Sequence, residues 1–235
     1  MKQSTDIAVI IPTFNEEGSI KNVIETWMDT IAGLDLKFSI NIYDGGSKDN
    51  TLEILETLRK KYSNLNVSVI PLLHGPSILK GYCENKDANW IFQMDGDNEI
   101  SADEFPAFWN LTTNHDFIIG RRSGRKGPIT RQIVSRIAYI LLNLLFGPEM
   151  KDVNCPYRLM RSSSFHKCFT SMKKNMLSPN LVITGFAAFK ALKTIEIDVD
   201  YKFRETGKAI DKTKLLKIAI KSFWQVISYR FKVKI

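Results

Sequence analysis

Short runs of apolar residues alternate with segments whose apolar residues recur at helical spacing, and this alternation constrains the fold more than any other feature of the chain. The first run, residues 7–11, is rich in isoleucine and valine and ends at Pro12. Apolar residues spaced three and four apart follow between Ile20 and Trp27. A continuous apolar run is typical of a strand buried on both faces, and the spacing after it is typical of one helix face. The sequence therefore predicts a strand, a polar loop and a helix in that order.

The same pattern recurs along the first half of the chain. Residues 38–43 predict a second strand, and the leucines between residues 52 and 58 predict a second helix. Further strands are expected at residues 67–72, 90–94 and 117–119. Strands that alternate with helices indicate the α/β class, with a mainly parallel sheet flanked by helices. Ligands of such sheets bind where the strands end, so the loops that follow the strands are the candidate site.

The length and the cysteines limit the class of protein. A chain of 235 residues suits a single domain with a substantial core. Its three cysteines, Cys83, Cys155 and Cys168, are widely spaced, which favours neither a disulfide framework nor a zinc site and indicates a reducing compartment. Residues 1–6 lack the basic start of a signal peptide. We therefore expect a cytoplasmic protein.

The net charge of +8 is concentrated at the end of the chain. Residues 201–235 hold ten lysines and arginines but only two acidic residues. Within this tail, residues 214–229 combine an apolar face with a row of lysines, a pattern typical of a helix that lies in a membrane interface. The alternative is a helix packed on its own domain with a solvated basic face. The apolar run at residues 137–146 is too short for the roughly 20 residues that span a bilayer, and predicts a buried or interfacial helix.

A cluster of carboxylates follows the strand expected at residues 90–94. Asp95 and Asp97 are separated by one glycine, and Glu99 follows two residues later. Carboxylates delivered at a strand end can converge on a divalent cation such as Mg²⁺ or Mn²⁺, which in turn binds phosphate. The alternative is an acidic turn, because Asp-Gly pairs are common in turns.

Three loops together resemble a known family. They are residues 11–17 (Ile-Pro-Thr-Phe-Asn-Glu-Glu), residues 44–51 (Asp-Gly-Gly-Ser-Lys-Asp-Asn-Thr) and Asp95-Gly96-Asp97, which matches a DxD motif. In this order and spacing they resemble the inverting family 2 glycosyltransferases of the GT-A fold, a Rossmann-like α/β fold, and most closely the polyprenyl-phosphate (dolichol-phosphate) sugar synthases. The resemblance covers roughly residues 6–210, without the transmembrane helices that end many relatives.

The resemblance implies a division of the chain and an activity. Residues 1–210 would form the GT-A domain, with a nucleotide-sugar-binding half at 1–100 and an acceptor half at 101–210, and residues 211–235 a basic amphipathic tail. The activity would be metal-dependent transfer of a hexose, with inversion, from a GDP- or UDP-sugar to a polyprenyl or dolichyl phosphate at the membrane surface. We expect peripheral membrane contact at the cytoplasmic face and no binding of nucleic acid.

The resemblance also implies roles for individual residues. The metal ligands would be Asp95, Asp97 and Glu99. The catalytic residues would be Asp97, Asp152, Arg122 and Arg131. The acceptor would contact Arg131, Ser135 and Arg158. The nucleotide sugar would contact Pro12, Phe14, Glu16, Asp44, Gly46, Ser47, Lys80, Asp95, Arg204 and Lys208.

Some positions depart from the family pattern. Gly45 replaces the second aspartate of an Asp-Asp pair, Pro156 replaces the central glycine of the acceptor motif, and Ala209 replaces a serine. The acidic residue usual near residues 178–180 is absent. These changes bear on the donor sugar and the acceptor rather than on the fold.

The acceptor remains open between two chemistries. A lipid phosphate is ionised at neutral pH and would attack the anomeric carbon without a general base, whereas a sugar hydroxyl on a glycan or glycolipid needs one. Asp152 is the candidate base, and a structural hydrogen-bonding role is its alternative. A protein that binds a nucleotide sugar without catalysis is a further alternative.

Overall fold

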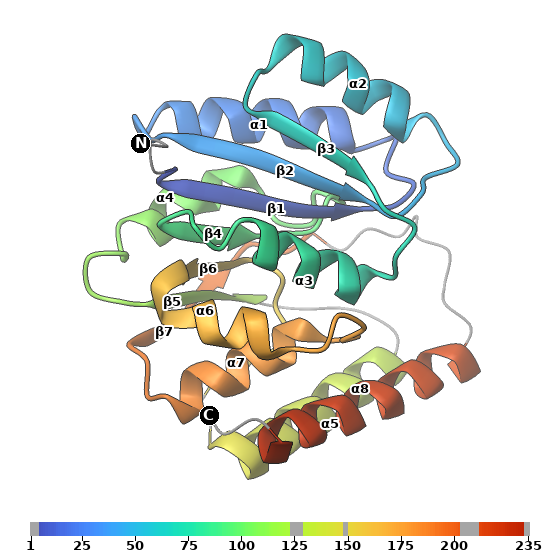
Figure 1. The fold of residues 1–235 in the computed structure, drawn as a ribbon, viewed down its shortest axis with the longest axis vertical. Coiled ribbons are helices and arrows are strands. Elements are labelled where there is room, and N and C mark those ends of the chain that lie inside the picture. Colours follow the sequence, from blue (N-terminus) through green and yellow to red (C-terminus); the bar gives the residue numbers. More distant parts are fainter. Residues whose placement is uncertain (1–4, 123–128, 148–149, 203–211, 233–235) are drawn as a thin grey trace.

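The protein folds around one seven-stranded sheet with helices on both faces (Figure 1). The computed structural model describes residues 5–122, 129–147, 150–202 and 212–232. The strands are β1 (Ile7–Thr13), β2 (Phe38–Asp44), β3 (Leu65–Val69), β4 (Trp90–Gln93), β5 (Phe117–Arg122), β6 (Arg158–Arg161) and β7 (Thr194–Val199). The helices are α1 (Ile20–Ala32), α2 (Thr51–Lys61), α3 (His74–Glu84), the 3-10 turn η1 (Ala102–Glu104), α4 (Phe105–Trp109), α5 (Ile129–Phe146), α6 (Ser162–Ser171), α7 (Pro179–Phe189) and α8 (Lys212–Lys232).

The strand order is β3-β2-β1-β4-β6-β5-β7. All the strand pairs are parallel except those of β6, which runs antiparallel between β4 and β5. The predicted α/β fold with a mainly parallel sheet is therefore confirmed. The chain leaves β1 first toward β2 and β3 and then returns to its other side at β4, so the order reverses between β1 and β4. In open α/β sheets, ligands bind at the carboxyl ends of the strands at such a reversal.

Burial explains the strands that the sequence indicated. All seven residues of β1 and all four of β4 are buried, as expected for strands covered on both faces. One group of helices (α1, α2 and α4) covers one face, and α3, α6 and α7 pack together on the other. The third strand was predicted at 67–72 but lies at 65–69, where its register with β2 ends at Val69.

Two strands were not predicted. β6 has four residues with an arginine at each end, too short and too polar to give an apolar run. β7 is an edge strand that carries Glu196 and Asp198 on alternate positions.

Helices α5 and α8 lie side by side along one edge of the molecule (Figure 1). α8 is docked on the domain: Val226 and Tyr229 are buried, and the Gln225 side chain accepts a hydrogen bond from the Leu177 N–H. Among the helices in the described residues, none combines the length and the hydropathy needed to cross a membrane.

Candidate functional site

Two loops at the carboxyl ends of β1 and β2 are joined by hydrogen bonds between backbone and side chain. The N–H of Asn15 donates to Ser47 Oγ, and the N–H of Glu16 donates to Thr51 Oγ1, both at 2.8 Å. In return the N–H of Lys48 donates to Asn15 Oδ1 at 2.8 Å. Asn15 has a φ of 56°, a left-handed conformation that asparagine tolerates better than most residues. These bonds hold the two predicted nucleotide-binding loops as one unit.

Asp44 shapes the second loop from inside. Its side chain is fully buried, and Oδ1 accepts hydrogen bonds from the N–H groups of Gly46 and Ser47, both at 2.8 Å. Oδ2 accepts a further bond from Ser47 Oγ at 2.5 Å. Gly46 has a φ of +87°, which favours glycine. Because its own loop engages both carboxylate oxygens, Asp44 holds the shape of this loop, and its predicted contact with the nucleotide sugar stays a prediction.

The carboxylates after β4 do lie together. Asp95, Asp97 and Glu99 line one pocket, together with Met94, Ile100, Pro156, Tyr157 and Tyr201. Burial, followed by the charges of Asp95 and Glu99, raises the pKa of Asp97 to about 7. The loop before α1 touches this segment, since Ser19 Oγ lies 3.0 Å from the Gly96 carbonyl and 2.9 Å from the Glu16 carboxylate. The pocket therefore concentrates negative charge beside the two joined loops.

The pocket is suited to a cation only with help from a ligand. Across the described parts of the chain, no three His, Cys, Asp or Glu side chains are grouped so that they could hold a metal ion by themselves. The predicted set of three protein ligands is thus not formed by the protein alone. Mg²⁺ is commonly bound by one or two carboxylates together with substrate phosphates. The negative charges around Asp97 fit a cation whose coordination is completed by substrate phosphates.

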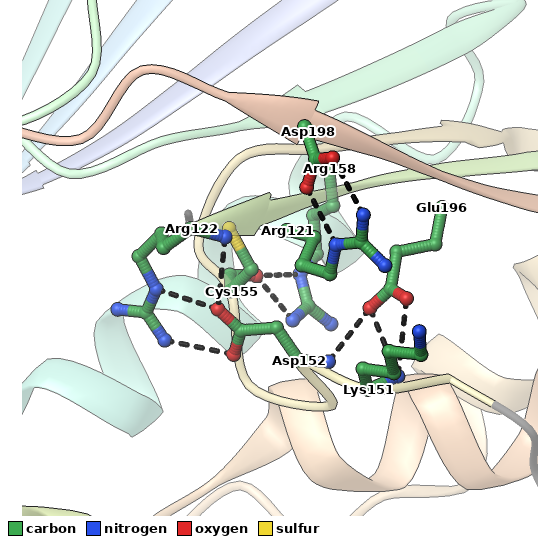
Figure 2. A network of polar contacts seen from close by, with 8 residues as sticks. All are labelled: Arg121, Arg122, Lys151, Asp152, Cys155, Arg158, Glu196 and Asp198. Carbon is green, nitrogen blue, oxygen red and sulfur yellow. Dashed lines mark hydrogen bonds and ion pairs between the residues drawn. The ribbon is translucent and has the colours of Figure 1, made fainter. Parts of the chain in front are cut away.

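Arg122, at the end of β5, forms a buried ion pair with Asp152 (Figure 2). Its Nε and Nη2 donate to Oδ2 and Oδ1 at 2.7 and 2.9 Å, and only 8% and 14% of the two side chains are exposed. Burial disfavours the charged guanidinium, but the hydrogen bonds and charge of Asp152 outweigh it, so the pKa of Arg122 is raised above its ordinary value. The Glu196 carboxylate accepts the N–H groups of Lys151 and Asp152 and fixes this loop to β7.

The Arg122 guanidinium also lies over the Tyr201 ring, 5.7 Å from its centroid, and Tyr201 lines the pocket. The ion pair of Arg122 and Asp152 is therefore next to the acidic pocket, and Tyr201 contacts both. Both oxygens of Asp152 are engaged by Arg122, an arrangement that favours the structural role of Asp152 over that of a general base.

Comparison with known proteins identifies the family. A model described as "Glycosyl transferase family 2" matches residues 8–169, which include both loops, the acidic cluster and Asp152. The chain belongs to glycosyl transferase family 2.

Two relatives are undecaprenyl-phosphate 4-deoxy-4-formamido-L-arabinose transferases. The one from Photorhabdus laumondii subsp. laumondii is 25% identical over 210 residues, which make up 88% of this chain and 63% of that protein. The one from Proteus mirabilis is 24% identical over 205 residues, or 86% and 61%. The chain thus spans less than two thirds of the length of these relatives.

A solved structure of similar fold supports the predicted fold. Glucosyl-3-phosphoglycerate synthase from Mycobacterium tuberculosis, crystallised with Mn²⁺, UDP-glucose and phosphoglyceric acid, superposes with a TM-score of 0.68 at 15% identity, covering 96% of this chain and 80% of that one. At this identity the likeness concerns the fold alone, and the predicted GT-A fold is confirmed.

Within this family 2 domain, several predicted residues lie away from the pocket. Arg158 is fully buried and donates to the carbonyls of Cys155 and Asn180, so an acceptor cannot reach it in this structure and the predicted acceptor contact does not fit its position. Lys80 forms an ion pair with Glu84 on α3 and does not line the pocket. Both side chains have a structural role: Arg158 binds two backbone carbonyls, and Lys80 pairs with a carboxylate on its own helix.

Some of the remaining predicted site residues lie in the described part of the chain, and others lie outside it. Pro12 is buried at the end of β1 and Phe14 is exposed just after it. Ser135 is half-buried on α5, where only the backbone of Arg131 is described. Arg204 and Lys208 lie outside the described residues.

Two side chains near Asp95 escaped the sequence analysis. Gln93 is buried in β4 and its Nε2 donates to Asp95 Oδ1 at 3.3 Å, while Asn180 at the start of α7 donates to Gln93 Oε1 at 3.0 Å. Tyr82 completes the chain by donating to Asn180 Oδ1 at 2.9 Å. A polar glutamine within the apolar run at 90–94 was the available signal. His74 lies with Nε2 3.5 Å from Asp95 Oδ1.

Proposed function

We propose that this protein transfers a hexose from a GDP- or UDP-sugar to a polyprenyl or dolichyl phosphate at a membrane surface, with Mg²⁺ or Mn²⁺ and with inversion at the anomeric carbon. The observation that carries the proposal is the crowding of Asp97 with Asp95 and Glu99 in a pocket at the sheet's reversal point, beside two loops that are held together. Family membership supports the class of reaction. The named relatives, which are undecaprenyl-phosphate sugar transferases, support the acceptor.

The joined loops would bind the nucleotide. Backbone groups of residues 13–17 and 45–48 are held at fixed positions by Ser47, Thr51 and Asn15, so a base and ribose would meet a preformed surface. Phe14 is exposed at this surface and offers a ring for stacking. We assign Glu16 and Asp95 to the same contact, and Arg204 and Lys208 as phosphate contacts.

The acidic cluster would act on the diphosphate. A divalent cation, when bound, neutralises the negative charge that develops on the leaving diphosphate. Asp97 and Glu99 would hold it from the protein side, with Asp95 toward the ribose, and Asp97 would be ionised in that complex because a cation favours the charged carboxylate. Gln93 and His74 would keep Asp95 oriented.

The acceptor oxygen would attack the anomeric carbon from the face opposite the leaving group. The new bond forms between the lipid phosphate oxygen and the anomeric carbon, and the bond from that carbon to the diphosphate oxygen breaks. No proton is transferred, because the attacking phosphate is already ionised. We propose Arg131 and Ser135 on α5 as contacts of the acceptor phosphate, with Arg122 acting through its pair with Asp152 and its contact with Tyr201.

The pairing of Asp152 is what favours a phosphate acceptor over a hydroxyl. A sugar hydroxyl requires a general base, and the two hydrogen bonds from Arg122 to Asp152 support a structural role for that carboxylate. If the acceptor is nevertheless a glycan or glycolipid hydroxyl, Asp152→Asn should lower turnover on that acceptor by ~10² or more while leaving donor binding intact.

Labelled GDP- and UDP-hexoses, incubated with a short polyprenyl phosphate and Mn²⁺, test the main proposal. A lipid-soluble labelled product supports it, and a product formed only with a glycan acceptor supports the alternative. If neither acceptor is modified and the donor is bound but never consumed, the protein is a nucleotide-sugar-binding protein. A thermal stabilisation screen with GDP, UDP and their sugars identifies the base, because a ligand raises stability by RT ln(1 + [L]/Kd).

The proposed site of action is the cytoplasmic face of a membrane, with peripheral contact through the basic tail at residues 211–235 and catalysis within residues 1–210. Support comes from the concentration of positive charge in that tail and from the lipid acceptors named for the relatives.

A further inference from the structure

Helices α5 and α8 each have an apolar face that the domain leaves uncovered. The exposed large apolar residues on α5 are Ile129, Ile133, Ile137, Ile140 and Leu144, and those on α8 are Leu216, Ile220, Trp224 and Phe231, with between 46% and 80% of each residue exposed. In both helices they recur three, four or seven residues apart, so they form one stripe along each helix. We call these nine residues the two-helix face.

The two stripes belong to neighbouring helices that run in the same direction. Near their ends, Arg230 on α8 donates from Nε to the Leu145 carbonyl of α5 at 3.0 Å, and its guanidinium lies 5.8 Å from the Phe146 ring centroid. Figure 1 shows the helices side by side along the lower edge of the molecule.

A second apolar face of each helix already supplies the packing. On α5, Ala138, Leu142 and Phe146 are buried, and on α8, Val226 and Tyr229 are buried. The two-helix face is therefore not needed to hold the helices on the domain. Exposed apolar groups collected in this way are characteristic of surfaces that meet another apolar phase.

The charge on these helices indicates that the apolar phase is a lipid bilayer with anionic headgroups. Neither residues 129–146 nor residues 212–232 include an aspartate or glutamate, whereas Arg136, Lys217, Lys221 and Lys232 are all exposed. Anionic headgroups complement such a surface, and the apolar side chains can enter the boundary with the acyl chains. A second copy of the chain would instead set these cations against each other, which opposes self-association.

We propose that the two-helix face docks on an anionic lipid bilayer, with α5 and α8 lying together in the interface. The bilayer contact is thus made by two helices and not by the basic tail alone. This deepens the proposed function and rests on it for its purpose: both helices begin on the side of the molecule at which the parallel strands end, so a docked membrane would present lipid phosphates near the pocket (Figure 1). Vesicle binding itself can be tested without any transfer.

Sedimentation with vesicles is the experiment. Wild type and a variant with Ile133→Gln, Ile137→Gln and Leu144→Gln are mixed with phosphatidylcholine vesicles with and without phosphatidylglycerol. Val69→Gln is the matched control, because Val69 is 55% exposed on the edge strand β3, away from both helices. We expect wild type and the control to sediment with the anionic vesicles and the α5 variant to bind about tenfold or more weakly.

A second variant addresses the charge. Lys217→Gln with Lys221→Gln should reduce the preference for phosphatidylglycerol and the sensitivity of binding to salt. The proposal is overturned if wild type ignores anionic vesicles, or if the α5 variant binds them as wild type does. It is also overturned if wild type is a dimer that the α5 substitutions dissociate while vesicles are not bound, since the face then joins two copies.

Two readouts separate this inference from the proposed function. Stabilisation by nucleotide shows that the α5 variant is folded with an intact donor site. Transfer to a short polyprenyl phosphate in solution should persist in that variant if the enzyme proposal holds, whereas vesicle binding without any transfer by wild type would refute the enzyme proposal and leave the docking face standing.

Discussion

The two halves of the molecule build their parts of the site in different ways. In the half that we propose binds the nucleotide (residues 1–100), small polar side chains join two loops through short hydrogen bonds to backbone N–H groups, as Ser47 and Thr51 do. In the half that we propose binds the acceptor (residues 101–210), a buried ion pair joins β5 to the loop of Asp152, and beside it helices α5 and α8 leave apolar faces uncovered. Several separate hydrogen bonds therefore join the loops of the first half. In the second half, the two hydrogen bonds of one buried ion pair hold β5 to the loop of Asp152.

The largest effect on stability should come from breaking the ion pair of the acceptor half. Arg122→Met leaves Asp152 without its guanidinium in a site where 14% of that side chain is exposed, and we expect the free energy of unfolding to fall by about 3 kcal/mol. Arg121→Met is the matched control, because its pair with Asp198 is 35% and 52% exposed and water can replace it. Urea denaturation of the two variants measures the difference, and equal losses would show that burial of the pair is unimportant.

A smaller effect should come from loosening the loops of the nucleotide half. Ser47→Ala removes the hydroxyl that accepts from Asn15 and donates to the buried Asp44, which should cost about 1 to 2 kcal/mol of stability. The KM for the nucleotide sugar should rise while kcat changes little, because we propose these loops as contacts of the donor and not of the acceptor. Ser63→Ala, on an exposed residue, is the control. A fall in kcat with an unchanged KM would contradict this division of roles.

The smallest effect should distinguish two bonds within the buried polar chain. Gln93→Met removes the amide that donates to Asp95, and Tyr82→Phe removes a hydroxyl that donates to Asn180 and Gln93. Each should lower stability by about 1 kcal/mol. Only Gln93→Met should weaken nucleotide binding in the presence of Mn²⁺, as measured by calorimetry. Equal weakening in both variants would mean that the chain supports the fold and not Asp95.

The first half of the chain could be predicted from sequence in more detail than the second. The first strands and helices are marked by continuous apolar runs and regular spacing. Asp44 finds its partners within three residues, whereas the bonds of Ser47 and Thr51 to the loop after β1 join residues 32 and 35 apart, and only the two motifs together pointed to them. The pairing of Arg122 with Asp152 joins residues 30 apart in the chain, and β6 becomes a strand only because β4 and β5 flank it. No local pattern encodes such contacts.

Helix α8 shows a further limit. The sequence assigned one apolar face and offered two roles for it, membrane contact or packing on the domain. The structure gives α8 two apolar faces: Val226 and Tyr229 pack inward, while Leu216 and Trp224 face outward. The spacing of apolar residues predicts a helix with an apolar face. Which of those residues are buried depends on where the helix packs against the rest of the domain.

Calorimetric titration of UDP and GDP, with Mn²⁺ and with the metal removed by EDTA, tests the central claim that the acidic pocket holds a cation-bound diphosphate. Wild type should bind one of the nucleotides about tenfold or more tightly with Mn²⁺. Asp97→Asn should lose that gain while remaining as stable as wild type, because the substitution relieves repulsion from Asp95 and Glu99. Asp87→Asn, on an exposed residue, should keep it. Metal-dependent binding that survives in Asp97→Asn would contradict the account.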